Sequence, residues 1–223
     1  MSQSDRQRQL LLDIEQEYLF TAGLTGISRP DPRVMRAMAA VPRHEFVPRE
    51  ESLFAYENYP LPIGYGQTIS QPYIVALMTE LLAIDEDDIL LEVGCGSGYQ
   101  AAILARLAKE VYSLEIVAPL AVAASARLKR LGYDNVTVKA GDGYQGLPAK
   151  APFNGIILTA AAPEVPAPLV AQLAEGGRMV LPVGPAGGRQ QLVVLNKGMD
   201  GQVERRVVLD VAFVPLTGQH GAG

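Results

Sequence analysis

Cysteine and histidine are scarce in this chain. Its 223 residues include one cysteine, Cys95, and two histidines, His44 and His220. A single cysteine excludes an intrachain disulfide and a zinc site built from several cysteines, and two histidines are too few for most histidine-based metal centres. We therefore expect a cytoplasmic protein that holds no metal.

Basic residues are fewer than acidic ones. The chain has 19 Lys and Arg residues against 24 Asp and Glu residues, a formal net charge of -5. Because affinity for nucleic acid comes largely from Lys and Arg side chains that neutralise phosphates, no nucleic-acid partner is expected.

No segment is suited to a membrane. Residues 1–8 are polar, so neither a signal peptide nor an anchor is expected there. Residues 58–79 carry no charge, but Pro60, Gly64 and Gln71 are among several helix breakers and amides that a lipid-facing helix would not contain. We expect no membrane partner, and the uncharged stretch needs another explanation.

The middle and the end of the chain alternate between strand and helix patterns. Strands are expected at 89–93, 110–115, 136–140 and 154–159, and helices at 99–108, 118–131 and 165–174. This alternation is typical of parallel βαβ units and predicts a doubly wound, mostly parallel sheet of the α/β class. Further runs at 179–183, 191–196 and 203–216 have no helices between them, which predicts an antiparallel hairpin at the sheet edge.

The N-terminal part is expected to be a helical extension. Helical spacing of apolar residues predicts a helix over 5–22, Asp31 followed by Pro32 predicts the start of a second one, and 73–82 reads as a third. Between them, residues 43–71 are rich in proline and glycine without a period, which indicates a long ordered loop or lid. We expect one structural domain, with N-terminal helices and a covering loop at 1–83, an α/β core at 84–217 and a flexible tail at 218–223.

The strongest motif is a glycine loop after the first expected core strand. Gly94, Gly96 and Gly98 alternate there, and acidic Glu92 lies within the strand. Such glycines let the backbone turn tightly and let a ligand approach its amides. The spacing differs from the G-x-G-x-x-G dinucleotide fingerprint and favours S-adenosylmethionine over NAD, although a tight strand-to-helix turn would also use glycine.

Acidic residues end the next two strands. Glu115 follows the glycines by about 20 residues, where a carboxylate can accept both ribose hydroxyl protons. Asp142, between Gly141 and Gly143, ends the following strand and could accept from an adenine amino group. Either acid alone is more often a turn or cap residue, but acids and glycines at three successive strand ends indicate a ligand site.

Several segments resemble one enzyme family. Residues 61–72 (LPIGYGQTISQP) are similar, almost residue for residue, to the loop that precedes the nucleotide site in protein-L-isoaspartate O-methyltransferases. The resemblance covers about residues 30–217 and extends through VPRHEFVP at 41–48, the glycine loop, GDG at 141–143, APF at 151–153, EGG at 175–177, LPVG at 181–184 and FVPL at 213–216.

The resemblance implies a Rossmann-like class I methyltransferase that uses S-adenosyl-L-methionine and releases S-adenosyl-L-homocysteine. Its acceptor would be the free α-carboxyl of L-isoaspartyl residues in damaged proteins and peptides, and the methyl ester would re-close to succinimide. The family's active-site serine corresponds to Ser70, which we expect to cap a helix and to orient substrate or cofactor without acting as a nucleophile. The predicted cofactor-binding residues are Thr68, Ile69, Ser70, Glu92, Gly94, Cys95, Gly96, Ser97, Gly98, Glu115, Asp142, Gly143 and Thr217.

The chemistry suits an uncharged site. An α-carboxyl group with a reference pKa of about 3.5 is already ionised at neutral pH, so no general base is needed. A carboxylate that attacks a sulfonium loses its charge together with the sulfonium, and exclusion of water favours that transition state. We interpret residues 58–79 as a cover for the reacting pair; a simple buried loop is the alternative.

Other residues carry less weight. Cys95 is expected to be a small loop residue, His44 to be structural and His220 to lie in a disordered tail.

Many bacterial relatives have Arg where this chain has Ala212, which leaves two alternatives open: a module that binds S-adenosylmethionine without isoaspartyl turnover, or a methyltransferase of the same fold with another acceptor. We expect a monomer.

Overall fold

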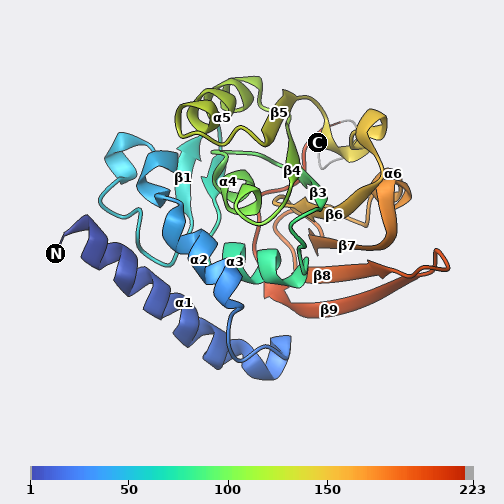
Figure 1. Ribbon diagram of the computed structural model, residues 1–223, viewed down its shortest axis with the longest axis horizontal. Helices are drawn as coiled ribbons and strands as arrows, with labels where there is room; N and C mark the ends of the chain where they lie inside the picture. Colours follow the sequence, from blue (N-terminus) through green and yellow to red (C-terminus); the bar gives the residue numbers. More distant parts are fainter. Residues whose placement is uncertain (1, 219–223) are drawn as a thin grey trace.

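A computed structural model describes residues 2–218, and its centre is a seven-stranded sheet in the order β5-β4-β3-β6-β7-β8-β9 (Figure 1). The first five of these run parallel, and β8 and β9 are antiparallel additions at one edge. This confirms the predicted doubly wound sheet with its antiparallel edge. The strands are β3 (Ile89–Val93), β4 (Glu110–Glu115), β5 (Val136–Ala140), β6 (Phe153–Leu158), β7 (Leu173–Val183), β8 (Gln190–Lys197) and β9 (Val203–Val211).

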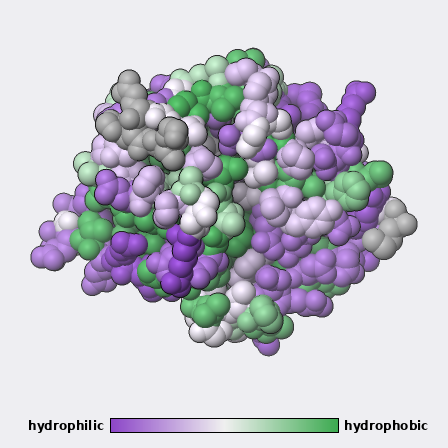
Figure 2. Space-filling view, turned by 180° about the vertical axis from the view of Figure 1, so that it is seen from behind, coloured by the Kyte–Doolittle hydropathy of each residue, from purple (hydrophilic) through white to green (hydrophobic). Residues whose placement is uncertain are grey.

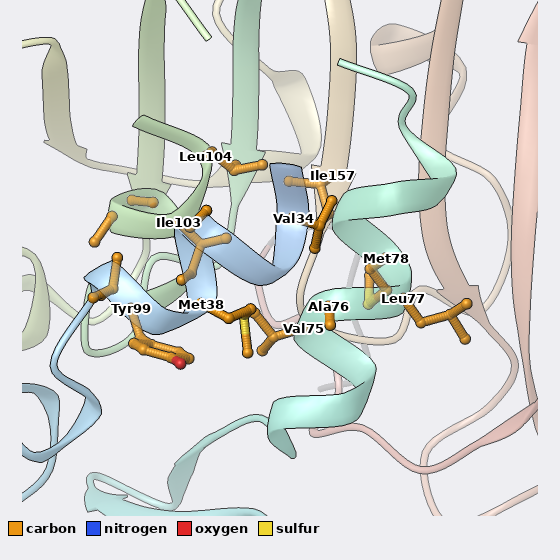
Figure 3. Close-up of a cluster of buried hydrophobic side chains, with 14 of the residues drawn as sticks. Val34, Met38, Val75, Ala76, Leu77, Met78, Tyr99, Ile103, Leu104 and Ile157 are labelled. Carbon is orange, nitrogen blue, oxygen red and sulfur yellow. The ribbon is translucent and has the colours of Figure 1, made fainter. Parts of the chain in front are cut away.

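Helices cover both faces of the sheet. Alternate residues of a strand point to opposite faces, so Leu90 belongs to a hydrophobic cluster with the N-terminal helices and Leu91 to a second cluster with the last helix. Figure 3 shows part of the first cluster, where α2, α3, α4 and β6 meet. The helices are α1 (Gln3–Thr25), α2 (Pro32–Ala40), α3 (Pro72–Leu81), α4 (Tyr99–Ala105), α5 (Ala118–Arg130) and α6 (Ala167–Gln172).

The N-terminal helices form as the sequence predicts. Asp31 caps α2 by accepting a hydrogen bond from the Arg33 backbone N–H, with Pro32 at the first helical position. Helix α1 is longer than expected; it ends at Thr25 and is capped by Gly26, whose φ of 77° suits glycine. It lies along the outside of α2 and α3 (Figure 1) and contributes Ile14 to the same buried cluster as Val208 of β9. The N-terminal helices and the sheet therefore share one core.

The stretch 43–71 is more regular than predicted. It contains two short 3₁₀ helices, Arg43–Phe46 and Arg49–Glu51, and a hairpin of β1 (Leu61–Gly64) and β2 (Gln67–Ile69). The hairpin turns at Tyr65 and Gly66, whose φ values of 55° and 70° match the twist of antiparallel strands. Glycine is typical of two-residue turns of this kind, so Gly66 could have indicated a hairpin where we expected an irregular loop.

Three expected boundaries near the C-terminus are wrong. The strand expected at 179–183 begins six residues earlier, at Leu173. The helix expected at 165–174 ends at Gln172, because Leu173 already pairs with Phe153 of β6. The strand expected at 203–216 ends at Val211, and the chain then crosses to the carboxyl ends of the parallel strands. There Ala161 donates a backbone hydrogen bond to Val214 and accepts one from Leu216, each 2.8 Å long. This crossing brings residues 214–217 to the site described next.

Candidate active site

The candidate site lies at the carboxyl ends of the parallel strands, where open α/β sheets bind ligands. Residues that follow β3, β4 and β6 surround a cavity of about 40 Å³ together with the hairpin and the segment 214–217. It is called the strand-end cavity below. Six predicted cofactor residues line it: Thr68, Gly94, Gly96, Glu115, Gly143 and Thr217.

A second cavity of about 30 Å³ adjoins the strand-end cavity, and Thr68, Gly94, Gly96 and Thr159 line both. We call it the inner cavity. It adds the predicted residues Ile69, Ser70, Cys95 and Ser97. Strand β2 with the following Ser70 and the glycine loop therefore face each other across these two spaces.

The glycine loop has a backbone that other residues would not adopt easily. Gly94 has φ 97°, and a Cβ there would lie 2.5 Å from the Thr159 hydroxyl oxygen. Gly98 has φ 87° and a different task, because it begins α4 and a Cβ there would lie 3.1 Å from Leu128 of α5. Gly94 thus permits a close approach to β6, whereas Gly98 permits close helix packing away from the cavities.

Glu115 is held in a fixed orientation by the backbone. One carboxylate oxygen accepts from the Gly96 N–H at 2.7 Å and the other from the Val117 N–H at 2.8 Å. The side chain is 5% exposed and lines the strand-end cavity. Because each carboxylate oxygen can accept more than one hydrogen bond, capacity remains for ligand hydroxyls.

Glu92 lies beneath the loop and lines neither cavity. Its side chain is fully buried and accepts a hydrogen bond from the Ser113 hydroxyl, while its other oxygen has no partner. Burial raises the pKa of Glu92 to about 8. Burial also raises the pKa of the Cys95 thiol, with the Glu92 carboxyl adding to the effect, so Cys95 is not an activated nucleophile.

Asp142 is a cap residue in the structure. Its carboxylate accepts from the Tyr144 N–H at 2.9 Å and starts the 3₁₀ helix Gly143–Gln145. Gly143 lines the strand-end cavity beside it. An adenine contact by Asp142 stays a prediction.

Ser70 does not cap α3, so that part of the prediction is wrong. The cap position is Gln71, which forms no side-chain cap hydrogen bond, because Pro72 occupies the first helical position and displaces the cap by one residue. The Ser70 hydroxyl forms no hydrogen bond within the described part of the chain. Ser70 lines the inner cavity and also a larger, open one, so its hydroxyl is available to a ligand.

The larger cavity, called the acceptor cavity here, has a volume of about 740 Å³. It lies between the hairpin, the start of α3 and the end of β9, and its lining consists of Pro60, Thr68, Ser70, Gln71, Ile74 and residues 210–214. Ala212 is thus placed beside the same cavity as Ser70. The acceptor cavity and the inner cavity share Thr68 and Ser70.

Arg43 supports this region from inside the protein, a role that the sequence did not indicate. Its side chain is fully buried, and Nη2 donates to the carbonyl oxygens of Tyr59 at 3.2 Å and Ser70 at 3.1 Å. Its guanidinium carbon lies 5.6 Å from the centre of the Tyr99 ring, and Nε and Nη1 have no hydrogen-bond partner. Burial lowers the pKa of Arg43 to about 10, which leaves it positively charged at neutral pH.

The sequence did not predict several other residues that line the two small cavities. Thr159 lines both small cavities and donates a hydrogen bond to the Gly94 carbonyl oxygen. It directly follows β6, so the strand-end rule that selected Glu115 and Asp142 would have found it. Val214 and Leu216 carry no such signal, because only the crossing of the C-terminal segment brings them there.

The remaining candidates lie elsewhere. His44 lines none of the three cavities, and its Nδ1 is 2.8 Å from the Tyr56 hydroxyl, which fits the expected structural role. His220 lies outside the described residues. Over residues 2–218 no cluster of three His, Cys, Asp or Glu side chains could hold a metal ion, and no helix combines the length and apolarity needed to cross a membrane.

Comparison with known proteins agrees with this geometry. Residues 19–221 match the family model of protein-L-isoaspartate(D-aspartate) O-methyltransferase. A protein-L-isoaspartate O-methyltransferase of Syntrophobacter fumaroxidans is 57% identical over 211 residues, which are 95% of this chain and 85% of the relative. One of Nitrosococcus oceani is 56% identical over 213 residues, 96% of this chain and 97% of the relative.

Solved structures agree as well. One protein-L-isoaspartate O-methyltransferase superposes with a TM-score of 0.83 at 28% identity, covering 96% of this chain and 67% of the other. A Plasmodium falciparum protein assigned to the same activity, in complex with S-adenosyl-L-homocysteine, has a TM-score of 0.74 at 26% identity and covers 94% and 97%. Because the family model matches nearly the whole of this chain, the chain belongs to the protein-L-isoaspartate(D-aspartate) O-methyltransferase family.

Proposed function

We propose that this protein transfers a methyl group from S-adenosyl-L-methionine to the free α-carboxyl of L-isoaspartyl residues in damaged proteins and peptides. The observation that carries the proposal is the meeting of two spaces at Thr68 and Ser70: the small cavities at the glycine loop and the open acceptor cavity. A donor in the small cavities and a polypeptide acceptor in the open one can therefore meet at these two residues.

The residues at the strand ends fit the proposed cofactor. Glu115 would hold the ribose hydroxyls, and Gly94 and Gly96 would bring the loop backbone close to the ligand. Thr68, Ile69, Ser70, Cys95, Ser97, Gly143 and Thr217 would form the rest of the cofactor contacts, with Glu92, Gly98 and Asp142 holding the loops in place. The cofactor supplies a methyl group on a positively charged sulfur.

The free volume at the cofactor side is small. Cavities of about 40 and 30 Å³ are far below the roughly 300 Å³ or more of typical small-molecule sites. We therefore expect strand β2 of the hairpin or the segment 214–217 to move outward when the cofactor binds. Hydrogen exchange at these segments is expected to slow when S-adenosyl-L-homocysteine is added.

The chain assists methyl transfer in two ways: it orients the acceptor carboxylate, and it excludes water from the reacting groups. The acceptor carboxylate arrives already ionised, so the protein has no proton to remove. Uncharged residues 58–79 limit access of water to the reacting pair, and buried Arg43 holds the backbone at Ser70 in place by donating to its carbonyl oxygen. The Ser70 hydroxyl is free to donate a hydrogen bond that fixes the carboxylate for in-line attack.

Replacement of Ser70 tests its proposed role. A hydrogen bond to a charged group contributes about 1.5–3 kcal/mol, so Ser70→Ala should lower kcat/KM for an isoaspartyl peptide by roughly tenfold to a hundredfold. Calorimetry should show nearly unchanged affinity for S-adenosyl-L-homocysteine. A rate equal to that of the parent would show that Ser70 is dispensable without refuting the proposed reaction.

The first assay follows methyl transfer from labelled S-adenosylmethionine to twin peptides, one with L-isoaspartate and one with normal aspartate. Base-labile ester on the isoaspartyl peptide alone is the expected result, and it would show that Ala212 is tolerated. Cofactor binding without transfer to either peptide would refute the proposed function and favour a binding module or another acceptor.

We infer that the protein works as a monomer in the cytoplasm. One chain lines all three cavities, so a second copy is not needed to complete the site. Light scattering at working concentration, with and without peptide, tests the monomer.

A further inference from the structure

A further cavity of about 460 Å³ extends the acceptor cavity away from Ser70. It lies between α1, α3, β8 and β9, and both cavities are lined by Gln71, Ile74 and Asp210. It is called the distal cavity here. Because Gln71 directly follows Ser70 and lines both cavities, the distal cavity begins beside the proposed acceptor position.

Two exposed apolar side chains line the distal cavity. Figure 2 shows that, on the face opposite to the view of Figure 1, hydrophobic and neutral residues collect in the middle, between hydrophilic residues at both sides. Leu24 of α1 is 68% exposed and Val207 of β9 is 45% exposed, and both line the distal cavity. They offer apolar surface to a chain lying between α1 and β9.

The polar groups of the distal cavity differ in whether they already have partners. Asp210 accepts from Nε of Arg189 with both carboxylate oxygens at 3.2 Å. By contrast, the side chains of Glu17, Gln71 and Gln191 form no hydrogen bond or salt bridge within residues 2–218. The one charge in the lining without a counter-charge is therefore the half-buried Glu17 carboxylate of α1.

We propose that the distal cavity is a binding subsite for the substrate polypeptide beyond its isoaspartyl residue, and that Glu17 gives it a preference for Lys or Arg. The proposal rests on the proposed function. The free amides of Gln71 and Gln191 bind the peptide backbone, which suits sequences that differ from one damaged site to the next. Leu24 and Val207 pack against the aliphatic part of a long cationic side chain whose head lies at Glu17.

The strand β9 indicates how far along the substrate the subsite lies. Asp210 lines both cavities, whereas Val207 lines only the distal one. Three residues of strand span about 10 Å, at roughly 3.3 Å per residue. An extended substrate that follows β9 therefore needs about three residues to pass from Asp210 to Val207, so positions three to five residues from the isoaspartate, on one flank, are expected to lie deep in the distal cavity.

The test uses isoaspartyl peptides that carry a single Lys or a single Glu at three, four or five residues on either flank. For the unmodified protein, kcat/KM should favour Lys over Glu by about twofold to fivefold at a position on one flank, as expected for one partly exposed charge pair. The preference should vanish in Glu17→Gln, reverse in Glu17→Lys and weaken in 1 M salt.

Two controls separate this role from a general effect. Glu15→Gln removes an exposed carboxylate from the same helix without touching the distal cavity, so the preference should persist. A short peptide that ends two residues from the isoaspartate should be methylated equally by the parent and by Glu17→Lys.

The outcomes distinguish the two proposals. Methylation of isoaspartyl peptides with equal rates for Lys and Glu at every position, in the parent and in Glu17→Lys, would overturn the distal subsite and leave the function standing. No methylation of any isoaspartyl peptide would overturn the proposed function itself.

Discussion

The cofactor side and the acceptor side of the site are built in different ways. At the cofactor side, polar side chains are held by the backbone: Glu115 accepts from two N–H groups, and Thr159 donates to the glycine loop. At the acceptor side, the side chains of Ser70, Gln71 and Gln191 have no partner within residues 2–218, and a buried arginine holds the backbone behind Ser70.

The difference matches the two kinds of ligand. A cofactor of constant structure is best bound by groups already fixed in place, because less ordering is needed on binding. A polypeptide whose sequence varies is better met by free amides and hydroxyls that can adapt. Changes at the cofactor side should therefore have the larger effects.

The strongest test of the rigid side is Gly94→Ala. The positive φ of 97° costs a residue with a Cβ about 1–2 kcal/mol, and crowding against Thr159 adds about 1–3 kcal/mol. We expect a large loss of stability and of affinity for S-adenosyl-L-homocysteine, measured by thermal denaturation and calorimetry. Gly23→Ala is the matched control, because a Cβ there meets no atom within 4 Å; similar losses in both variants would contradict the prediction.

A substitution at Arg43 should affect the acceptor side much more than the cofactor side. Arg43→Met leaves the Tyr59 and Ser70 carbonyl oxygens without their donor, so the hairpin should loosen and kcat/KM for an isoaspartyl peptide should fall by about tenfold to a hundredfold. The affinity for S-adenosyl-L-homocysteine should change much less, and hydrogen exchange at residues 59–70 should accelerate. Arg43→Lys, which keeps the charge, should recover part of the rate. Equal losses of cofactor and peptide binding would show that the two sides are not separable.

The last prediction concerns the pH dependence of stability. The pKa of Glu92 is about 8 in the folded protein, above the unfolded value of about 4.3, so the folded state holds a proton that the unfolded state releases between these values. The stabilisation from this proton is complete below about pH 4.3 and is lost as pH rises toward 8. Urea denaturation should show Glu92→Gln gaining stability relative to the parent from pH 5 to pH 8; a constant difference would contradict this.

The same division appears in what the sequence could predict. Four of the five parallel strands follow from local patterns, because the strand and helix periods can be recognised without the partner strand; the fifth, β7, was expected only over 179–183. Gly94, Glu115 and Gly143 follow from their positions at strand ends, and the structure brings them together. The family resemblance located Ser70 beside them.

The acceptor side depends on contacts between distant parts of the chain. Arg43 meets the Ser70 carbonyl across 27 residues, and Glu17 of α1 lines a cavity with Asp210 of β9. No local pattern distinguishes a buried arginine from an exposed one, or a glutamate beside a groove from one in solvent. The cap assigned to Ser70 was wrong because the prediction did not place Pro72 at the first helical position.

The sequence by itself therefore determined the fold class, the family and the residues at the strand ends, since these depend on short-range periodicity and on backbone demands for glycine. Only the tertiary structure decided which side chains remain free at the acceptor side and which charge lies behind it. Those properties arise when α1, the hairpin and β9 pack together, and packing of distant segments is set by the whole core.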